Sequence, residues 1–187
     1  MKKNILLFIL SLSVLFINIS CVEEDPKGVS FNKTEFSEQK KKWLSSKPES
    51  YSFVYSFSTY MPDYVIGNVS VTKDYSNASI LLSKGTGDET ELESSSKYHL
   101  DSMEDVFDFI HSEYERALKT VESGDYEYIE IKVTYNETYG YPEYISNPGS
   151  GGKRDIKDKT GRYVGHNSED YSFTMTDFSV EQDTSEN

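Results

Sequence analysis

The chain has 187 residues, of which 36% are hydrophobic and 14% aromatic, and its 19 Lys and Arg against 32 Asp and Glu give a formal net charge of -13. This charge disfavours nucleic acid as a partner, because phosphate binding depends on lysine and arginine replacing counterions. The aromatic residues, mostly tyrosine and phenylalanine, exclude a wholly disordered chain and favour a β-rich core.

The first twenty residues have the pattern of a secretory signal peptide. Lys2 and Lys3 precede an apolar run, and Ser20 is a small residue directly before Cys21, after which the sequence becomes polar. The run is short for a membrane span. We therefore predict a signal peptide over residues 1–20 and exclude it from the fold.

Cys21 is the one cysteine of the chain, so it has no partner for an internal disulfide. The stretch "FINISC" resembles the lipobox of bacterial lipoproteins. The resemblance implies a lipid on Cys21, attachment to a membrane and an extracytoplasmic place in the bacterial cell envelope, at the outer membrane where the cell has one. An unmodified cysteine after an ordinary signal peptide is the alternative. Residues 21–31 contain Pro26 and Gly28 without periodicity and are predicted to be a flexible tether.

A first helix is predicted at about residues 34–45. Asn32 can cap it, Glu35 stands at the capping-box position, and Pro48 follows its end. Trp43 lies on its apolar face, and we expect this side chain to hold the helix against a sheet.

Strands are predicted next. Residues 51–60 alternate aromatic and serine positions, which is typical of an antiparallel strand with one packed face. A turn at residues 61–63 leads to a second strand at 64–74, in which Gly67 is interpreted as a bulge. A third strand is expected at 78–84, followed by an acidic loop at 85–96.

The second helix is predicted within residues 99–125. Asp101 and Glu104 form a cap-and-box pair, and Gly124 is a stop signal. Apolar residues recur at helical spacing, namely Met103, Phe107, Ile110, Tyr114 and Ala117.

Three strands complete the domain. Residues 126–135 alternate, Gly140 and Pro142 mark a turn into a returning strand, and a hydrophilic stretch leads to a last strand at 171–180. We predict an α+β fold in the order helix-strands-helix-strands, with an antiparallel meander sheet covered on one face by two helices. Residues 32–180 form this single domain, and the tail 181–187 is predicted to be disordered.

The segments "YSFVYSF", "SMEDVFDFI", "IEIKVTYNETYGYPEYI" and "EDYSFTMTDF" together resemble bacterial extracytoplasmic proteins grouped as domain of unknown function 6174. The resemblance covers about Phe36 to Phe178. It implies the fold and carries no activity, cofactor or site residue.

The tyrosines around Gly140 are interpreted mainly as packing, with their hydroxyls in water. The functional alternative is a binding surface for a sugar ring or a peptide. This surface would combine Tyr139, Tyr141 and Tyr144 with three residues of the hydrophilic stretch, namely Lys153, Arg154 and His166.

No short motif for catalysis or metal binding is present. His99, His111 and His166 lack zinc-ligand spacing, and no nucleophile elbow or phosphate-binding loop occurs. Acidic clusters at 85–93 and 155–161 do not match an EF-hand, although their carboxylates are of the type that binds calcium. We therefore predict no catalytic residue, metal or cofactor.

The favoured hypothesis is a non-enzymatic binding or accessory domain, anchored through Cys21, with an envelope protein or glycan as partner. An inhibitor-like module that occupies a partner enzyme with an acidic loop is the alternative, and an envelope hydrolase ranks third.

Overall fold

The computed structural model describes residues 28–59, 64–73, 75–84, 87–124, 126, 128–147 and 171–181. The predictions for the signal peptide, Cys21, the turn at 61–63, the stretch containing Lys153, Arg154 and His166, and residues 182–187 of the tail lie outside these residues.

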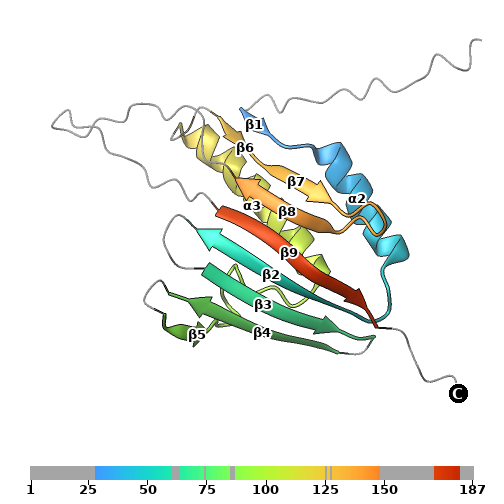
Figure 1. Cartoon of the computed structure of the whole chain (residues 1–187). Helices are drawn as coiled ribbons and strands as arrows, with labels where there is room; N and C mark the ends of the chain where they lie inside the picture. Colours follow the sequence, from blue (N-terminus) through green and yellow to red (C-terminus); the bar gives the residue numbers. More distant parts are fainter. Residues whose placement is uncertain are drawn as a thin grey trace, which may run out of the picture.

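An antiparallel sheet forms the centre of the described structure (Figure 1), with strand order β5-β4-β3-β2-β9-β8-β7. One meander runs from β2 to β5 and a second from β7 to β9, and they join where β2 pairs with β9. The strands are β2 (Tyr51–Thr59), β3 (Tyr64–Val71), β4 (Ser76–Ser83), β5 (Glu89–Glu91), β7 (Lys132–Tyr135), β8 (Pro142–Asn147) and β9 (Tyr171–Val180). This arrangement confirms the predicted α+β meander.

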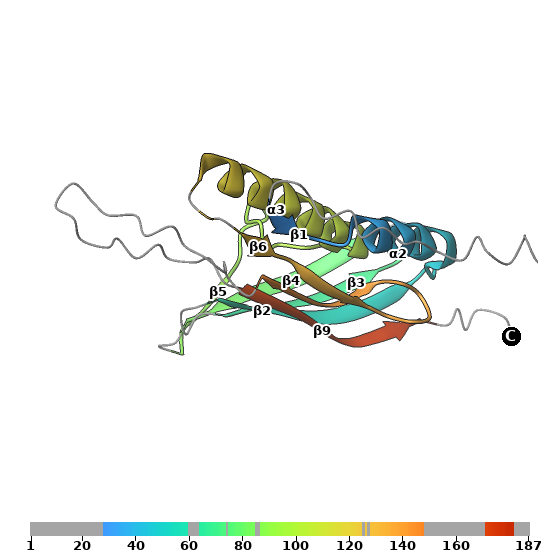
Figure 2. The same cartoon turned by 90° about the horizontal axis from the view of Figure 1, so that it is seen from above.

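Two helices, α2 (Lys33–Ser46) and α3 (Met103–Ser123), cover the same face of the sheet (Figure 2). Both were predicted, and the order of helices and strands is confirmed. The side chain of Asn32 accepts from the backbone N–H of Glu35, as expected for a capping box. Gly124 ends α3 in the left-handed conformation with φ 83°.

The core lies between the sheet and the helices. The predicted alternation of β2 is confirmed, since its buried residues are Tyr51, Phe53, Tyr55 and Phe57. Trp43 is 0% exposed and meets Tyr51 edge-on, with ring centroids 5.1 Å apart. The helix is therefore held to the sheet by the side chain that was expected to hold it.

A short strand precedes the first helix and was not predicted. β1 (Val29–Ser30) pairs in parallel with β6 (Ile129–Glu130), and Val29 is 2% exposed. Phe31 continues from β1 and packs against Tyr114 of α3 at 5.1 Å. The predicted tether over residues 21–31 is thus wrong at its end, because residues 29–31 belong to the packed body.

Gly67 does not mark a bulge. The pairing of β3 with both neighbours is unbroken through this residue. A Cβ atom at this position would lie 2.1 Å from Cε1 of Tyr55, so glycine is needed because the tyrosine ring occupies the space. The bulge lies instead in β9, where the register shifts opposite Phe53 and Asp177 has φ 53°.

The predicted N-cap of the second helix is one residue too early. Ser102 is the cap, and its hydroxyl accepts from the backbone N–H of Asp105. Asp105 in turn accepts from the Ser102 hydroxyl and from the backbone N–H of Asp101. Glu104 is left to pair with Lys47, at the end of α2.

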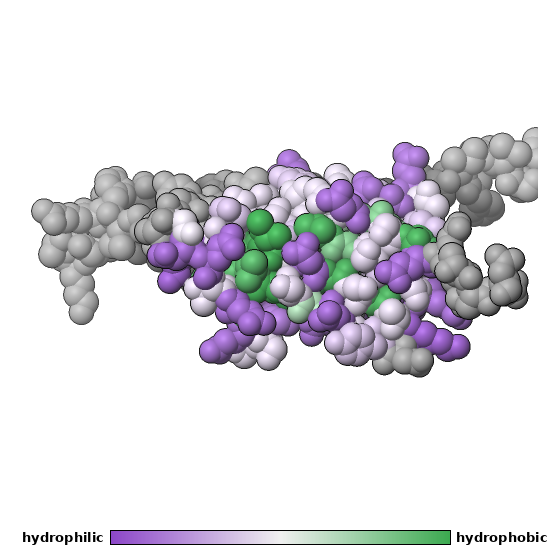
Figure 3. Space-filling model, turned by 60° about the horizontal axis from the view of Figure 1, so that its bottom comes forward, coloured by the Kyte–Doolittle hydropathy of each residue, from purple (hydrophilic) through white to green (hydrophobic). Residues whose placement is uncertain are grey.

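The region predicted as an acidic loop contains an edge strand. β5 pairs with β4, and all three of its residues are exposed. Figure 3 brings the β4–β5 edge forward and shows a band of apolar residues bordered by hydrophilic ones. The acidic side chains at this edge discourage pairing with further strands.

Candidate functional site

The three tyrosines of the predicted binding surface do not share one surface. Tyr141 is 7% exposed and stacks on Phe178 with ring centroids 4.3 Å apart, and Tyr139 packs on the same ring at 5.7 Å. Tyr144 neighbours the buried Ile145 along β8, so it projects from the opposite face of the sheet, where it is 39% exposed. The interpretation of this segment as architecture therefore fits Tyr139 and Tyr141.

The turn that carries these residues is held by its own hydrogen bonds. The side chain of Asn136 accepts from the backbone N–H groups of Thr138 and Tyr139. Gly140 has φ 80° in the predicted turn, and a Cβ there would lie 2.9 Å from the carbonyl oxygen of Gln39 in α2. The turn thus approaches the first helix too closely for a larger residue.

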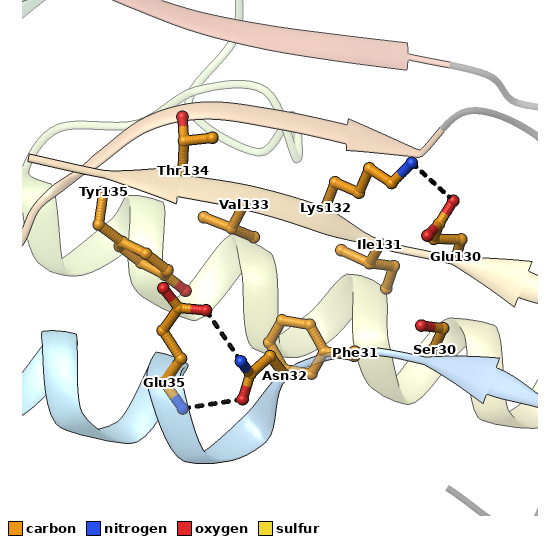
Figure 4. Close-up of a pocket in the computed structure, with 10 residues that line it drawn as sticks. All are labelled: Ser30, Phe31, Asn32, Glu35, Glu130, Ile131, Lys132, Val133, Thr134 and Tyr135. Carbon is orange, nitrogen blue, oxygen red and sulfur yellow. Dashed lines mark hydrogen bonds and ion pairs between the residues drawn. The ribbon is translucent and has the colours of Figure 1, made fainter. Parts of the chain in front are cut away.

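A cleft of about 360 Å³ lies between the start of α2 and the edge of β7 (Figure 4). Phe31, Asn32 and Glu35 line one side. The segment 130–135 lines the other, with Ile131 and Val133 contributing apolar surface. The volume lies near the lower end of the range of about 300–1,000 Å³ that is usual for ligand sites.

Tyr135 is the unusual member of this cleft. Its hydroxyl is buried and has no hydrogen-bond partner in the described structure. Burial, and secondarily the negative charge of Glu35, raise the pKa of this hydroxyl above its ordinary value. The group therefore stays protonated at physiological pH and is an available hydrogen-bond donor.

Glu35 supplies the matching acceptor. One carboxylate oxygen accepts from Nδ2 of Asn32 at 2.9 Å, which holds the side chain over the first turn of α2. Among the described residues, no lysine or arginine forms an ion pair with Glu35, whereas Glu130 at the other end of the cleft is paired with Lys132 at 3.0 Å. The uncompensated charge of the cleft is therefore that of Glu35.

A second polar cluster lies on α3 and is internally satisfied. Glu113 is 3% exposed, and Arg116 donates to its carboxylate through Nε and Nη2. A buried charge with a bidentate partner is a structural pair, since removing either member would leave the other uncompensated.

The histidines and carboxylates do not build a metal site in the described part of the chain, where no group of three or more His, Cys, Asp or Glu side chains is placed to hold an ion. His99 bridges Asp101 at 2.9 Å and the carbonyl of Leu92 at 3.2 Å, and so ties the preceding loop to the start of α3. His111 is exposed on α3.

Sequence reasoning missed the cleft. Glu35 was recognised only as a capping residue, and Tyr135 only as one more alternating residue of a strand. The sequence offers no signal for it, because residues 129–135 alternate without interruption. Only the structure shows that this stretch pairs first with β1 and then with β8.

The sheet, its one-sided helical layer and the cleft at its edge define a small α+β domain of two joined meanders. The chain belongs to the family described as "Family of unknown function (DUF6174)", whose model matches residues 35–147. No curated protein and no solved structure matches the chain. The match ends before β9, although this strand joins the two meanders. Neither helix of the described residues is long and apolar enough to cross a membrane.

Proposed function

We propose that this protein is a lipid-anchored, extracytoplasmic binding domain of the bacterial cell envelope and that it uses the cleft beside β7 to hold a protein partner without chemistry. The observation that carries the binding role is the buried, unpaired hydroxyl of Tyr135 opposite the uncompensated carboxylate of Glu35. A buried donor without a partner lowers stability, so its presence at a cleft favours a role in recognition.

The chemistry of the cleft favours binding over catalysis. Because its pKa is raised, Tyr135 stays protonated near neutral pH and cannot serve as a general base. The cleft contains no Ser–His or Cys–His pair, since its ten lining residues include neither histidine nor cysteine. Its polar groups can therefore orient a ligand but do not form an activated nucleophile.

The proposal of a lipid anchor is based on the sequence of the first 21 residues. Two basic residues, an apolar run and Ser20-Cys21 have the order expected of a lipoprotein signal. Two or three acyl chains bury tens of methylenes at about 0.8 kcal/mol each, which is enough for stable attachment. The test is incorporation of radiolabelled palmitate into the full chain and into Cys21→Ala. Labelling of the wild type alone supports the anchor, and equal labelling of both refutes it.

The binding role is tested by cross-linking in intact cells, followed by purification of the full chain from the envelope fraction. The expected result is a discrete adduct with one envelope protein, reduced in Tyr135→Phe and kept in Tyr75→Phe, whose side chain is 64% exposed. Absence of any adduct in the wild type would contradict a protein-binding role and would leave a glycan partner to be tested with purified envelope polysaccharide.

The inhibitor-like alternative is favoured by a different feature, the fully exposed acidic edge strand β5. If that alternative holds, the cross-linked partner is an enzyme, and charge-neutral β5 variants restore its activity. An adduct that depends on Tyr135 and not on β5 excludes it.

A further inference from the structure

Among the described residues, only the first half of the edge strand beside the cleft pairs with another strand on its outer side. β6 and β7 are nearly continuous, and β1 pairs with the first half through Val29 and Ser30. At Phe31 the chain leaves this edge to begin α2, and the cleft opens where β1 stops. The second half of the edge, residues 132–135, is the last strand of the seven-stranded sheet in the described structure.

The direction of the backbone groups at this edge follows from the bonds to β1. Ile129 donates its N–H to the carbonyl of Gly28, and Ile131 donates to the carbonyl of Ser30. Because strand groups alternate in direction with a period of two, the N–H and C=O of Val133 point to the same outer side. They therefore face the cleft, in line with the ladder that β1 begins.

We propose that an extended peptide segment of a partner protein, carrying a basic side chain, adds as a strand to the β7 edge in continuation of β1. This rests on the proposed binding function and specifies its ligand. The backbone of Val133 supplies the main-chain pairing, as in other complexes in which a peptide extends a sheet. The Tyr135 hydroxyl donates to a carbonyl or side-chain oxygen of the peptide, and Glu35 accepts from its lysine or arginine.

The negative charge of the cleft and of the whole chain favours a basic peptide segment as the ligand. The lining residues carry one compensated pair, Glu130 with Lys132, and the single negative charge of Glu35. The whole chain has a net charge of -13, so approach of a cationic segment is favoured and approach of an acidic one is opposed. The opposite edge of the sheet ends in the acidic, exposed residues Glu89 and Glu91, which protect it against strand addition.

The experiment uses the purified full chain in detergent and measures binding of three peptide pools by fluorescence anisotropy. The first pool contains acetylated heptapeptide amides in which Val, Ile, Tyr or Phe alternates with Lys or Thr. The second carries N-methyl groups on alternate backbone nitrogens, and the third has Glu in place of Lys. The expected result is saturable binding of the first pool and affinity lower by about tenfold for each of the others, because main-chain pairing or the ion pair is lost.

Three variants connect binding to the cleft. Tyr135→Phe and Glu35→Gln are each expected to weaken binding of the first pool by about fivefold, since each loses one polar contact. Val133→Pro removes an N–H that points outward and is expected to abolish binding. The matched controls are Tyr75→Phe and Glu91→Gln, which bear the same changes away from the cleft and should bind as the wild type does.

Folding is followed in parallel. Tyr135→Phe removes a buried hydroxyl without a partner, so its melting temperature should equal or exceed that of the wild type. This separates a loss of binding from a loss of structure, even if Val133→Pro fails to fold.

Equal binding of the N-methylated pool, or unchanged binding by both Tyr135→Phe and Glu35→Gln, would overturn strand addition at this edge. Absence of saturable binding by the first pool would also overturn it. If the wild type is a dimer and Val133→Pro is a monomer, the occupant of the edge is instead a second copy of the chain. If the cell-envelope adduct forms equally with wild type and Tyr135→Phe, the binding function stands and the assignment to this cleft fails.

Discussion

Replacement of Gly67 by alanine tests the packing of the sheet most directly. The new Cβ would lie 2.1 Å from Cε1, 2.2 Å from Cζ and 2.7 Å from the hydroxyl oxygen of Tyr55. The tyrosine ring cannot easily move, because it is 0% exposed and stacks on Phe173 with ring centroids 5.6 Å apart. Its hydroxyl also donates to the carbonyl of Tyr98 at 2.9 Å and accepts from the N–H of Leu100 at 3.1 Å.

The expected loss combines two contributions. Overpacking of a core usually costs about 1–3 kcal/mol. A shift of the ring large enough to relieve the clash would break one or both hydrogen bonds of the hydroxyl, and each buried group left unpaired costs about 1–3 kcal/mol more. We expect Gly67→Ala to lower the free energy of unfolding by about 3–5 kcal/mol, equivalent to a melting temperature lower by about 10–15 °C for a domain of this size.

Urea unfolding followed by the fluorescence of Trp43, the one tryptophan of the chain, measures this loss. Asn68→Ala is the control, because this neighbouring side chain is exposed on the other face of β3. Tyr55→Leu removes the clashing ring atoms, so the double variant with Gly67→Ala should be more stable than the sum of the single losses predicts. A loss below about 1 kcal/mol for Gly67→Ala would show that Tyr55 is free to move and would refute the reasoning.

Three further outcomes are expected. Burial raises the pKa of Glu104, but the hydrogen bond and the charge of Lys47 outweigh burial and hold this pKa below the usual range. The Lys47–Glu104 pair therefore stabilises the fold fully above the unfolded pKa of about 4.3. This stabilisation is lost as the pH falls through the lower folded pKa. Lys47→Met should accordingly lower the free energy of unfolding at pH 7 by up to about 1 kcal/mol, given the partial exposure of both groups, and a difference that persisted undiminished at about pH 3 would contradict this. Because Asp177 has φ 53° at the bulge of β9, Asp177→Gly should leave stability unchanged or raise it by up to about 1 kcal/mol. By contrast, Asp177→Val should lower stability by about 1–3 kcal/mol in the same urea titration, and equal stability of the two variants would show that this backbone conformation is not maintained.

Structural features that depend only on residues close together in the sequence could be predicted from it. The alternation of β2 and the helical spacing of α3 state which faces are buried, because each pattern repeats within one element. Errors arose where two local interpretations competed. Ser102 and Asp101 are both good N-caps, and the choice was made by Asp105, whose carboxylate accepts from the backbone N–H of Asp101 and from the Ser102 hydroxyl. Gly67 looked like a bulge because only the folded sheet shows Tyr55 above it.

The sequence by itself determined the α+β class, the two helices, the meander strands other than β5 and the positive φ of Gly140, since short-range sterics and hydrophobic periodicity decide these. Tertiary structure decided the site. The cleft exists because residues 31–35 and 130–135, about a hundred positions apart, meet at one sheet edge, where β1 stops pairing after two residues. Whether a tyrosine hydroxyl finds a partner depends on every group that packs around it, and at Tyr135 none of the described groups accepts its proton.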